Sequence, residues 1–350
     1  MADSPSSSES KATSYRAAGV DLAAAEAAKQ RIARTVAGTR TRWVTGTVGA
    51  FGGMVRVPEG FTEPTLVMST DGVGTKVLVA EAAGRYHTVG EDLVNHSVND
   101  ILVHGATPLA FMDYIAGADL AVGTIADLVE GVARGCRAHE MALTGGETAQ
   151  MLDVYQPGHF DLAGTIVGVV ERAAAIHGDA IVPGDVLLGY ASTGLHTNGY
   201  TLARRILFGD MGLAIDDPLG DMEGTVADAL LATHRSYFNA VWSVIAHMHG
   251  MAHITGGGIP GNLVRILPKS TSAEVNAESW PVPTLFTLLQ QGGRVDTEEM
   301  REVFNLGIGY IGVLAAESVT KTVEAAERAG VETWVIGEIR TGKQEVRFTT

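Results

Sequence analysis

The sequence has a single cysteine, Cys136, among 350 residues, which excludes an internal disulfide and any metal site built from several cysteines. Basic residues are also scarce, because 25 Lys and Arg stand against 40 Asp and Glu, for a net charge of −15. So acidic a chain is a poor partner for nucleic acid or an anionic membrane, both of which need basic surface. A phosphorylated ligand must therefore be held by loop amides, single cations or a metal ion.

Long apolar runs are missing as well. None reaches the roughly 18 residues of a membrane-spanning helix, and the first residues lack the charged-then-apolar layout of a secretory signal. We therefore expect a soluble, cytoplasmic protein with neither membrane nor nucleic-acid partners. Residues 1–13 are polar and rich in serine, which predicts a disordered tail.

Glycine, by contrast, is abundant: the chain has 43, about 12% against a usual ~7%. The glycines cluster between segments with clear strand or helix patterns, which indicates tight turns and close approach of the backbone to a ligand. Strands are predicted at residues 65–70, 109–116, 141–143, 160–170, 185–191, 253–255, 309–314 and 333–339. Helices are predicted at residues 21–36, 89–104, 125–139, 200–208, 226–249, 284–291, 298–304 and 319–329.

A break in the pattern divides the chain. After residue 172 the strand signal ends, and the turn signal Pro183-Gly184 precedes the next buried strand. We therefore predict two domains, residues 14–172 and 173–350. Strand and helix patterns alternate in both, which predicts an α/β or α+β fold.

The segment Asp71-Gly-Val-Gly-Thr-Lys76 follows a predicted buried strand. A carboxylate placed there can bind Mg²⁺, the glycine amides can face phosphate oxygens, and Lys76 adds a positive charge. The glycine spacing is not that of a Walker A loop. An ordinary solvated turn is an equally good interpretation of this segment.

Further carboxylates occur on the predicted helix 89–104 and after the predicted strand 141–143. One helical stripe about 100° wide contains Asp92, His96, Asn99 and Asp100. The solvated face of an amphipathic helix is the commoner explanation of such a stripe. Glu147 follows a Gly-Gly pair, and alone it fits a surface turn better than a site. Three acidic sites in one half of the chain are nevertheless what Mg²⁺ and ATP phosphates require.

Two loops have the composition of anion-binding turns. Residues 194–200 (GLHTNGY) place His196 and Asn198 before a predicted helix, and residues 253–260 (HITGGGIP) place three glycines at a helix start. A plain turn or a helix cap explains each loop equally well.

Together, these motifs resemble one family. Asp100-Ile-Leu-Val-His-Gly-Ala-Thr-Pro108 fits the Asp-x4-Gly-Ala-x-Pro signature of the ATP-dependent aminoimidazole ribonucleotide synthetase superfamily. Within that group the sequence is most similar to the aminoimidazole ribonucleotide synthetases themselves. Agreement extends over about residues 14–340, in the family's order, through SYRAAGVD (14–21), FGG (51–53), DGVGTK (71–76), residues 90–114, GGETA (145–149), GLHTNGY (194–200), HITGGGIP (253–260) and FNLGIG (304–309).

The resemblance implies a homodimer in which the N-terminal ATP-binding and dimerisation domain pairs with its copy to form a β-barrel. A C-terminal α/β domain packs beside it, with the active site in the groove between the two. The implied reaction is the ATP-dependent ring closure of formylglycinamidine ribonucleotide to 5-aminoimidazole ribonucleotide in purine biosynthesis, with release of ADP and phosphate. The implied cofactors are ATP and Mg²⁺.

The resemblance also implies roles for single residues. Asp71, Asp100 and Glu147 would bind the metal, His196, Lys76 and Asp100 would be catalytic, and His196 would act as general acid or base. ATP and substrate would be held by Gly52, Gly53, Asp71, Gly72, Gly74, Thr75, Lys76, Asn99, Asn198, Thr255, Gly256, Gly257 and Gly258.

Three alternatives stay open. A selenophosphate synthetase would need a reactive cysteine in an N-terminal glycine-rich loop, and this chain has none there. A thiamine-monophosphate kinase typically has more aspartates at its metal site, one of them where Thr255 stands here. A non-catalytic nucleotide-binding protein would keep the fold. The joint presence of Asp71, Lys76, Asp100 and Glu147 favours an enzyme.

Overall fold

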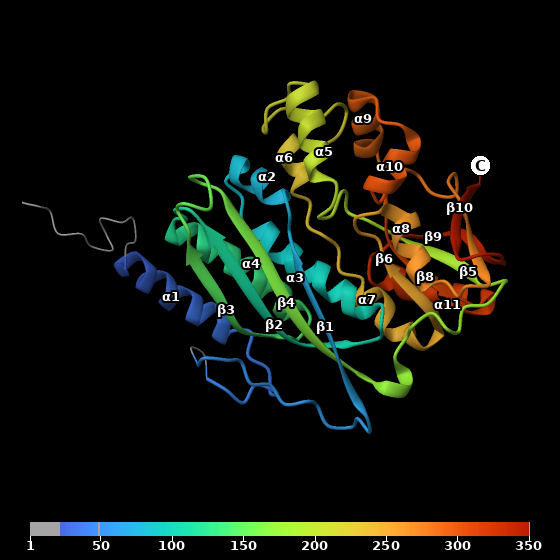
Figure 1. Ribbon diagram of the computed structural model, residues 1–350, viewed down its shortest axis with the longest axis horizontal. Helices are drawn as coiled ribbons and strands as arrows, with labels where there is room; N and C mark the ends of the chain where they lie inside the picture. The colour runs from blue at the N-terminus through green and yellow to red at the C-terminus, as the bar shows by residue number, and fades with distance from the viewer. Residues whose placement is uncertain (1–21, 48–49, 350) are drawn as a thin grey trace, which may run out of the picture.

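The computed structural model describes residues 22–47 and 50–349, so the predicted tail, the 14–21 motif and the first residue of the predicted helix 21–36 lie outside the described residues. Figure 1 shows two α/β units side by side, each built on one sheet. Within the described residues, no helix is both long and apolar enough to cross a bilayer.

The first unit contains a four-stranded sheet of order β1-β4-β2-β3, in which only the β2–β3 pair is parallel. Helices α3 and α4 cover one face of this sheet (Figure 1). The elements are α1 Leu22–Ala37, β1 Pro64–Gly72, α2 Lys76–Ala83, α3 His87–Leu102, β2 Thr107–Gly117, α4 Val122–Ala138, β3 Ala142–Gln150, β4 Phe160–Glu171 and the 3₁₀ turn η1 Arg172–Ala174.

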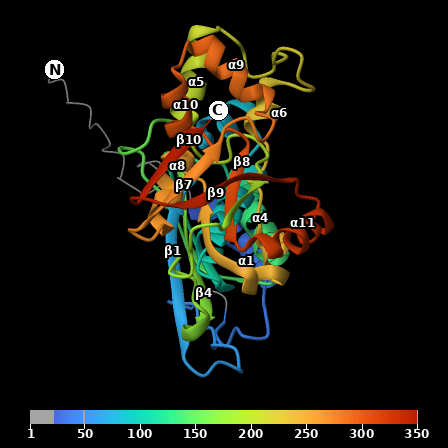
Figure 2. The ribbon, with the colours of Figure 1, turned by 90° about the vertical axis from the view of Figure 1, so that its right-hand side faces the viewer.

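The second unit contains a six-stranded mixed sheet of order β10-β7-β9-β5-β8-β6. Figure 2 shows this unit from its own side, with the strands of the first unit extending below it. Its strands are β5 Val186–Ala191, β6 Met248–His253, β7 Thr271–Asn276, β8 Ile308–Leu314, β9 Thr333–Thr341 and β10 Glu345–Thr349. Its helices are α5 Tyr200–Arg204, η2 Arg205–Asp210, α6 Val226–Leu230, α7 Phe238–Val241, η3 Trp242–His247, α8 Gly258–Leu263, η4 Val264–Ile266, α9 Thr284–Gly293, α10 Thr297–Val303, η5 Ala316–Ser318 and α11 Val319–Arg328.

Helices α3 and α4 approach each other closely through two glycines. A Cβ on Gly90 would lie 2.2 Å from the carbonyl oxygen of Leu128, and one on Gly131 would lie 2.1 Å from that of His87. Since no side chain fits at either place, glycine is required there. This close packing fixes α3, which carries the predicted polar stripe, against α4.

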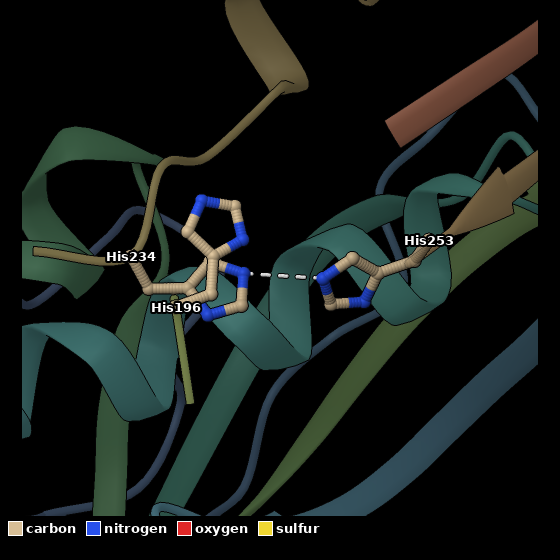
Figure 3. Close-up of side chains that lie close together, drawn as sticks. All are labelled: His196, His234 and His253. Atoms are coloured by element: carbon tan, nitrogen blue, oxygen red, sulfur yellow. Dashed lines mark hydrogen bonds between the residues drawn. The ribbon is translucent and has the colours of Figure 1, made fainter. Parts of the chain in front are cut away.

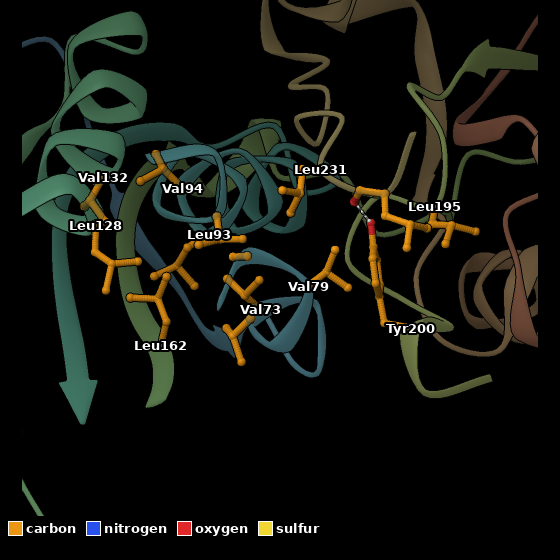
Figure 4. Close-up of a cluster of buried hydrophobic side chains, with 14 of the residues drawn as sticks. Val73, Val79, Leu93, Val94, Leu128, Val132, Leu162, Leu195, Tyr200 and Leu231 are labelled. Carbon is orange, nitrogen blue, oxygen red and sulfur yellow. Dashed lines mark hydrogen bonds between the residues drawn. The ribbon is translucent and has the colours of Figure 1, made fainter. Parts of the chain in front are cut away.

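The main hydrophobic core is continuous between the two units. Figure 4 shows Leu93 and Leu162 of the first unit in one cluster with Leu195, Tyr200 and Leu231 of the second. The Tyr200 hydroxyl donates to the carbonyl of Leu230, so its polar end is satisfied inside this apolar region. The packing therefore holds the two units in one fixed arrangement.

The mixed α/β class and most predicted elements are confirmed, but three predictions are wrong. The predicted helix 226–249 is instead α6, an irregular segment 231–237, the short helices α7 and η3, and the start of β6. The predicted strand 253–255 overlaps β6, Met248–His253, only at His253, because residues 254 and 255 already belong to the loop before α8. The predicted strand 141–143 runs on to Gln150, because β3 pairs with β2 from Ala142 to its end. The predicted domain limits stay a prediction, and the two sheets fall on either side of residue 172.

Candidate functional site

A cavity of about 480 Å³ lies between the two units. The end of β1, the C-terminal half of α3, residues 176–178, β6 and the α8 region line it. Its polar lining consists of Ser69, Asp71, Asp100, His104, His177, His253, Thr255, Asn262 and Arg265. We call this cavity the groove.

Two carboxylates converge in the groove. Asp71 Oδ2 lies 2.7 Å from His96 Nε2, and that nitrogen lies 3.7 Å from Asp100 Oδ2. Asp100 also accepts hydrogen bonds from His253 Nδ1 at 2.8 Å and from the Ser69 hydroxyl at 3.0 Å.

These contacts keep both carboxylates ionised. Burial raises the pKa of each, but His96 outweighs it and lowers the pKa of Asp71. For Asp100, His253 and His96 outweigh burial and bring the pKa to about 2. Two ionised carboxylates side by side are the oxygen ligands that a divalent cation such as Mg²⁺ prefers. The structure thus brings together two of the three predicted metal ligands.

Behind the carboxylates lie three buried histidines, His196, His234 and His253 (Figure 3). The Nε2 atoms of His234 and His253 are 3.1 Å apart. The rings of His196 and His234 stack with centroids 4.0 Å apart and planes at 19°. An imidazole binds a metal in its ring plane, and two nearly parallel rings share no such position. In this arrangement the cluster fits a hydrogen-bonding role better than a shared metal site.

One path of close polar contacts joins the two carboxylates through the rings of His96, His234 and His253. Its five contacts measure 2.7, 2.7, 3.3, 3.1 and 2.8 Å. In order, the path runs Asp71, His96, Thr197, His234, His253, Asp100.

The path requires one proton more than its neutral groups supply. Each of five contacts needs one proton, whereas three neutral imidazoles and one hydroxyl provide four. Burial lowers the pKa of His234 and of His253. Burial also acts on His96, but its contacts with Asp71 and Asp100 prevail and raise its pKa. We therefore assign the extra proton to His96, next to Asp71.

Lys76 does not face the groove. Its side chain is fully buried, and its Nζ lies 2.7 Å from Asp92 Oδ2. The same ammonium donates to the carbonyls of His196 and Ala232, at 3.1 and 2.8 Å. Burial lowers the pKa of Lys76 and raises that of Asp92, while the ion pair opposes both shifts. The ammonium thus has three acceptors inside the protein and is not exposed to the groove.

Other predicted residues also lie at the contact between the units. Asn99 donates to the carbonyl of Arg235 and accepts from the amide of Tyr237. His196 is buried, and burial places its pKa well below the usual value. Thr75 contacts the hydroxyl of Thr201 at 3.1 Å.

The glycines of the predicted site shape two turns. Gly72 donates its amide to Asp71 Oδ1 at 2.6 Å, and Gly74 has a positive φ of 64°. In the other turn Thr255 lines the groove, while Gly257 and Gly258 have φ of 94° and 58°. Asn198 approaches this second turn, since its Oδ1 would be 3.4 Å from a Cβ on Gly256.

The remaining predicted residues lie near the far edge of the first sheet. A Cβ on Gly53 would lie 2.5 Å from Thr144 of β3, and the neighbouring Gly52 is exposed. Glu147 is an exposed residue of the same strand. Since β3 and β1 are opposite edges of a four-stranded sheet, Glu147 is roughly 14 Å from Asp71. A single chain therefore does not bring Glu147 to the groove.

Sequence reasoning missed His234 and Arg265, and it assigned no role to His253. His234 falls in the segment predicted as helix, where no motif marks it. His253 is the first residue of the HITGGGIP motif, but it is not among the predicted site residues. That motif was the available signal, because it places His253 at the end of a strand beside the glycine turn.

Comparison with known proteins gives a family for both halves of the chain. The model described as AIR synthase related protein, N-terminal domain, matches residues 53–170, and the one for the C-terminal domain matches residues 182–349. The chain belongs to the AIR synthase related family. Its curated relatives include phosphoribosylformylglycinamidine cyclo-ligases from Sorangium cellulosum and Myxococcus xanthus, both 46% identical. The alignments cover 93% and 95% of this chain and 94% and 97% of the relatives.

Solved structures of more distantly similar proteins share the fold. Thiamine-monophosphate kinase from Stenotrophomonas maltophilia has a TM-score of 0.67 at 20% identity, over 90% of this chain and 94% of that one. Hydrogenase maturation protein HypE, solved in complex with ATP, has a TM-score of 0.62 at 17% identity, over 90% and 88%. At these identities the likeness establishes the architecture that the AIR synthase related family shares.

Proposed function

We propose that the chain catalyses the ATP-dependent ring closure of formylglycinamidine ribonucleotide to 5-aminoimidazole ribonucleotide, with release of ADP and phosphate. The main support is the 46% identity to cyclo-ligases over nearly the whole of both chains. The groove supports the same conclusion, because it pairs ionised carboxylates with a cavity large enough for a nucleotide.

The chemistry needs positioning and charge neutralisation more than a nucleophile. The formyl amide oxygen is a poor leaving group until it takes the γ-phosphoryl group of ATP, when an O–P bond forms and ADP departs. The substrate nitrogen then attacks the activated carbon, phosphate leaves with the oxygen, and one proton is lost as the imidazole forms. In phosphoryl transfer of this kind, catalysis is almost entirely orientation and electrostatic stabilisation.

We assign the two ends of the groove to different ligands. Asp71 and Asp100 would hold Mg²⁺, which neutralises the ATP phosphates. Away from these carboxylates the lining includes His104, His177 and Arg265, which are the basic groups available for the 5′-phosphate of the ribonucleotide. His253 donates from Nδ1 to Asp100, and its Nε2 contacts His234. It can therefore orient the Asp100 carboxylate while it keeps its contact with His234.

We further propose a homodimer that completes the site. The face of the four-stranded sheet away from α3 and α4 exposes large apolar side chains: Leu66, Met68, Met112 and Tyr114 are 37% to 64% exposed. An apolar patch of this kind on a sheet is typical of an interface. Pairing of two such faces could bring Glu147 and the Gly52-Gly53 loop of a second copy to the Asp71 edge of this one.

The deciding experiment measures ADP and imidazole formation together. Purified protein with Mg²⁺ and ATP should release one ADP per aminoimidazole formed, and only when formylglycinamidine ribonucleotide is present. Thiamine monophosphate in its place should yield no ADP. ADP release independent of the ribonucleotide, or consumption of ATP without ring closure, would contradict the proposal.

A further inference from the structure

The irregular segment 231–237 is held mainly by side chains of α3, with further contacts from Lys76 to the Ala232 carbonyl and from Thr193 to the Thr233 carbonyl. Its backbone makes hydrogen bonds at 2.6 to 2.9 Å to three residues spaced along that helix. They run from the His234 amide to Asp92, from Asn95 to the His234 carbonyl, from Asn99 to the Arg235 carbonyl and from the Tyr237 amide to Asn99. One face of α3 thus takes the place of a neighbouring strand for this segment.

Lys76 and Asp92 form the end of this arrangement nearest the apolar core. Both side chains are fully buried, and their 2.7 Å ion pair is surrounded by backbone groups of the second unit. Lys76 donates to the carbonyl of His196, and Asp92 accepts from the amide of His234. The pair therefore contacts the backbone of both stacked histidines.

We propose that Lys76 and Asp92 are positioning residues, which fix the His196 and His234 rings relative to the carboxylates of the groove. Neither touches the reacting atoms. Their action passes through the two backbone groups they bind, and from there through His234 to His253 and Asp100. This inference rests on the proposed function only where turnover is the readout.

Stability alone gives little reason to keep such a pair. Burying two charges costs desolvation free energy that their mutual attraction often does not offset. Well-packed apolar residues frequently replace such a pair without loss of stability. A second ion pair, between Arg85 and Asp228, also joins the two units, but it is exposed and contacts no histidine. Removing this exposed pair is therefore the matched control for losing an ion pair between the two units.

The first test uses the wild-type protein. The ¹⁵Nζ resonance of Lys76 is followed while Mg²⁺ and a non-hydrolysable ATP analogue are added to saturation. A positioning lysine, buried among protein partners, keeps its shift and its slow ammonium exchange. A clear shift on binding would overturn the proposal in favour of direct phosphate contact, and this readout needs no turnover.

The second test compares Lys76→Met, the double variant Lys76→Met/Asp92→Leu and Arg85→Met. The single variant leaves Asp92 charged and unpaired, so its melting temperature should fall most. The double variant should regain most of that loss, because no buried charge remains. We expect its kcat to stay reduced by about 100-fold, the scale of misplacing a catalytic group, with KM for ATP near the wild-type value and altered ring ¹⁵N shifts for His196 and His234. Arg85→Met should match wild type in kcat and ring shifts.

Recovery of kcat together with melting temperature in the double variant, or unchanged ring shifts, would overturn the positioning role. If the double variant does not fold, the ammonium measurement on the wild type decides the matter. Wild-type protein without any ring-closing turnover would refute the proposed function instead, and the ring shifts would still test the positioning.

Discussion

Asp113 is a half-buried carboxylate in the middle of the first sheet, and it should set much of the pH dependence of stability. Side chains alternate along β2, so Asp113 shares the inward face with the fully buried Phe111 and Ile115. Among the described residues no Lys, Arg or His pairs with it. Burial raises its pKa from 3.8 to about 7.

The sign and size of the effect follow from linkage. Because the folded pKa exceeds the unfolded one, the folded state binds the proton more tightly between pH 3.8 and about 7. The contribution of Asp113 to stability is therefore greatest below pH 3.8, falls as the pH rises, and levels off above pH 7. A shift of about 3 pH units corresponds to about 4 kcal/mol as an upper limit.

Asp113→Asn keeps the shape of the side chain and removes its charge. We expect the variant to unfold at a higher urea concentration than wild type at pH 8, by about 2–4 kcal/mol in the free energy of unfolding, and to match wild type near pH 4. Asp127→Asn on the exposed face of α4 is the control, and it should follow the wild-type pH curve. A difference that stays constant from pH 4 to pH 8 would refute the reasoning, because a titrating carboxylate cannot produce it.

Three further perturbations test the site and its assembly. If Glu147 acts across a dimer, the Glu147→Gln and Asp100→Asn proteins should each be inactive alone. Mixing them in equal amounts and allowing subunits to exchange should restore about a quarter of wild-type activity, since half of the dimers then hold one intact site of two. If mass measurement shows exchange but no activity returns, Glu147 does not belong to a shared site. Arg265→Ala should raise KM for the ribonucleotide by about tenfold or more while KM for ATP stays constant, as expected for a lost charge-assisted contact to phosphate; an equal rise in both would argue against a phosphate-specific role. Gly258→Ala should lower the free energy of unfolding by about 2–3 kcal/mol, because its Cβ would lie 1.9 Å from the Arg301 carbonyl oxygen. The Cβ of Gly261→Ala would meet nothing within 4 Å, so this control should be nearly neutral. Urea unfolding measures both variants, and equal stability would contradict the steric argument.

Much of the fold could be predicted from local pattern. The strands β1, β4 and β8 and the helices α3, α4 and α11 lie where the pattern of their apolar residues predicts them. The segment 231–237 could not be predicted in this way. Its backbone partners are mainly side chains of α3, about 140 residues earlier in the chain, so nothing in its own sequence reveals that it is irregular rather than helical.

The site was predictable in its residue types and only partly in its geometry. Asp71 and Asp100 meet as the motifs suggest, since both end elements that point into the groove. Lys76 directly follows the same loop but turns inward to Asp92. Motif spacing places a side chain near a site without fixing its direction, and a buried partner that lies 16 residues later decided it here.

Helix α3 explains how the buried ion pair and the groove depend on one another. Asp92 and Asp100 are eight residues apart, which is about 12 Å along the axis of one helix and about 80° around it, within its polar face. Toward the N-terminal end of α3, Asp92 is covered by Lys76 and the segment 231–237. Toward its C-terminal end, Asp100 lines the groove. Since α3 is fixed to α4 at glycine contacts, the two ends cannot shift independently. A change at Asp92 must therefore reach the groove through the histidines it supports, while Asp100 itself stays in place.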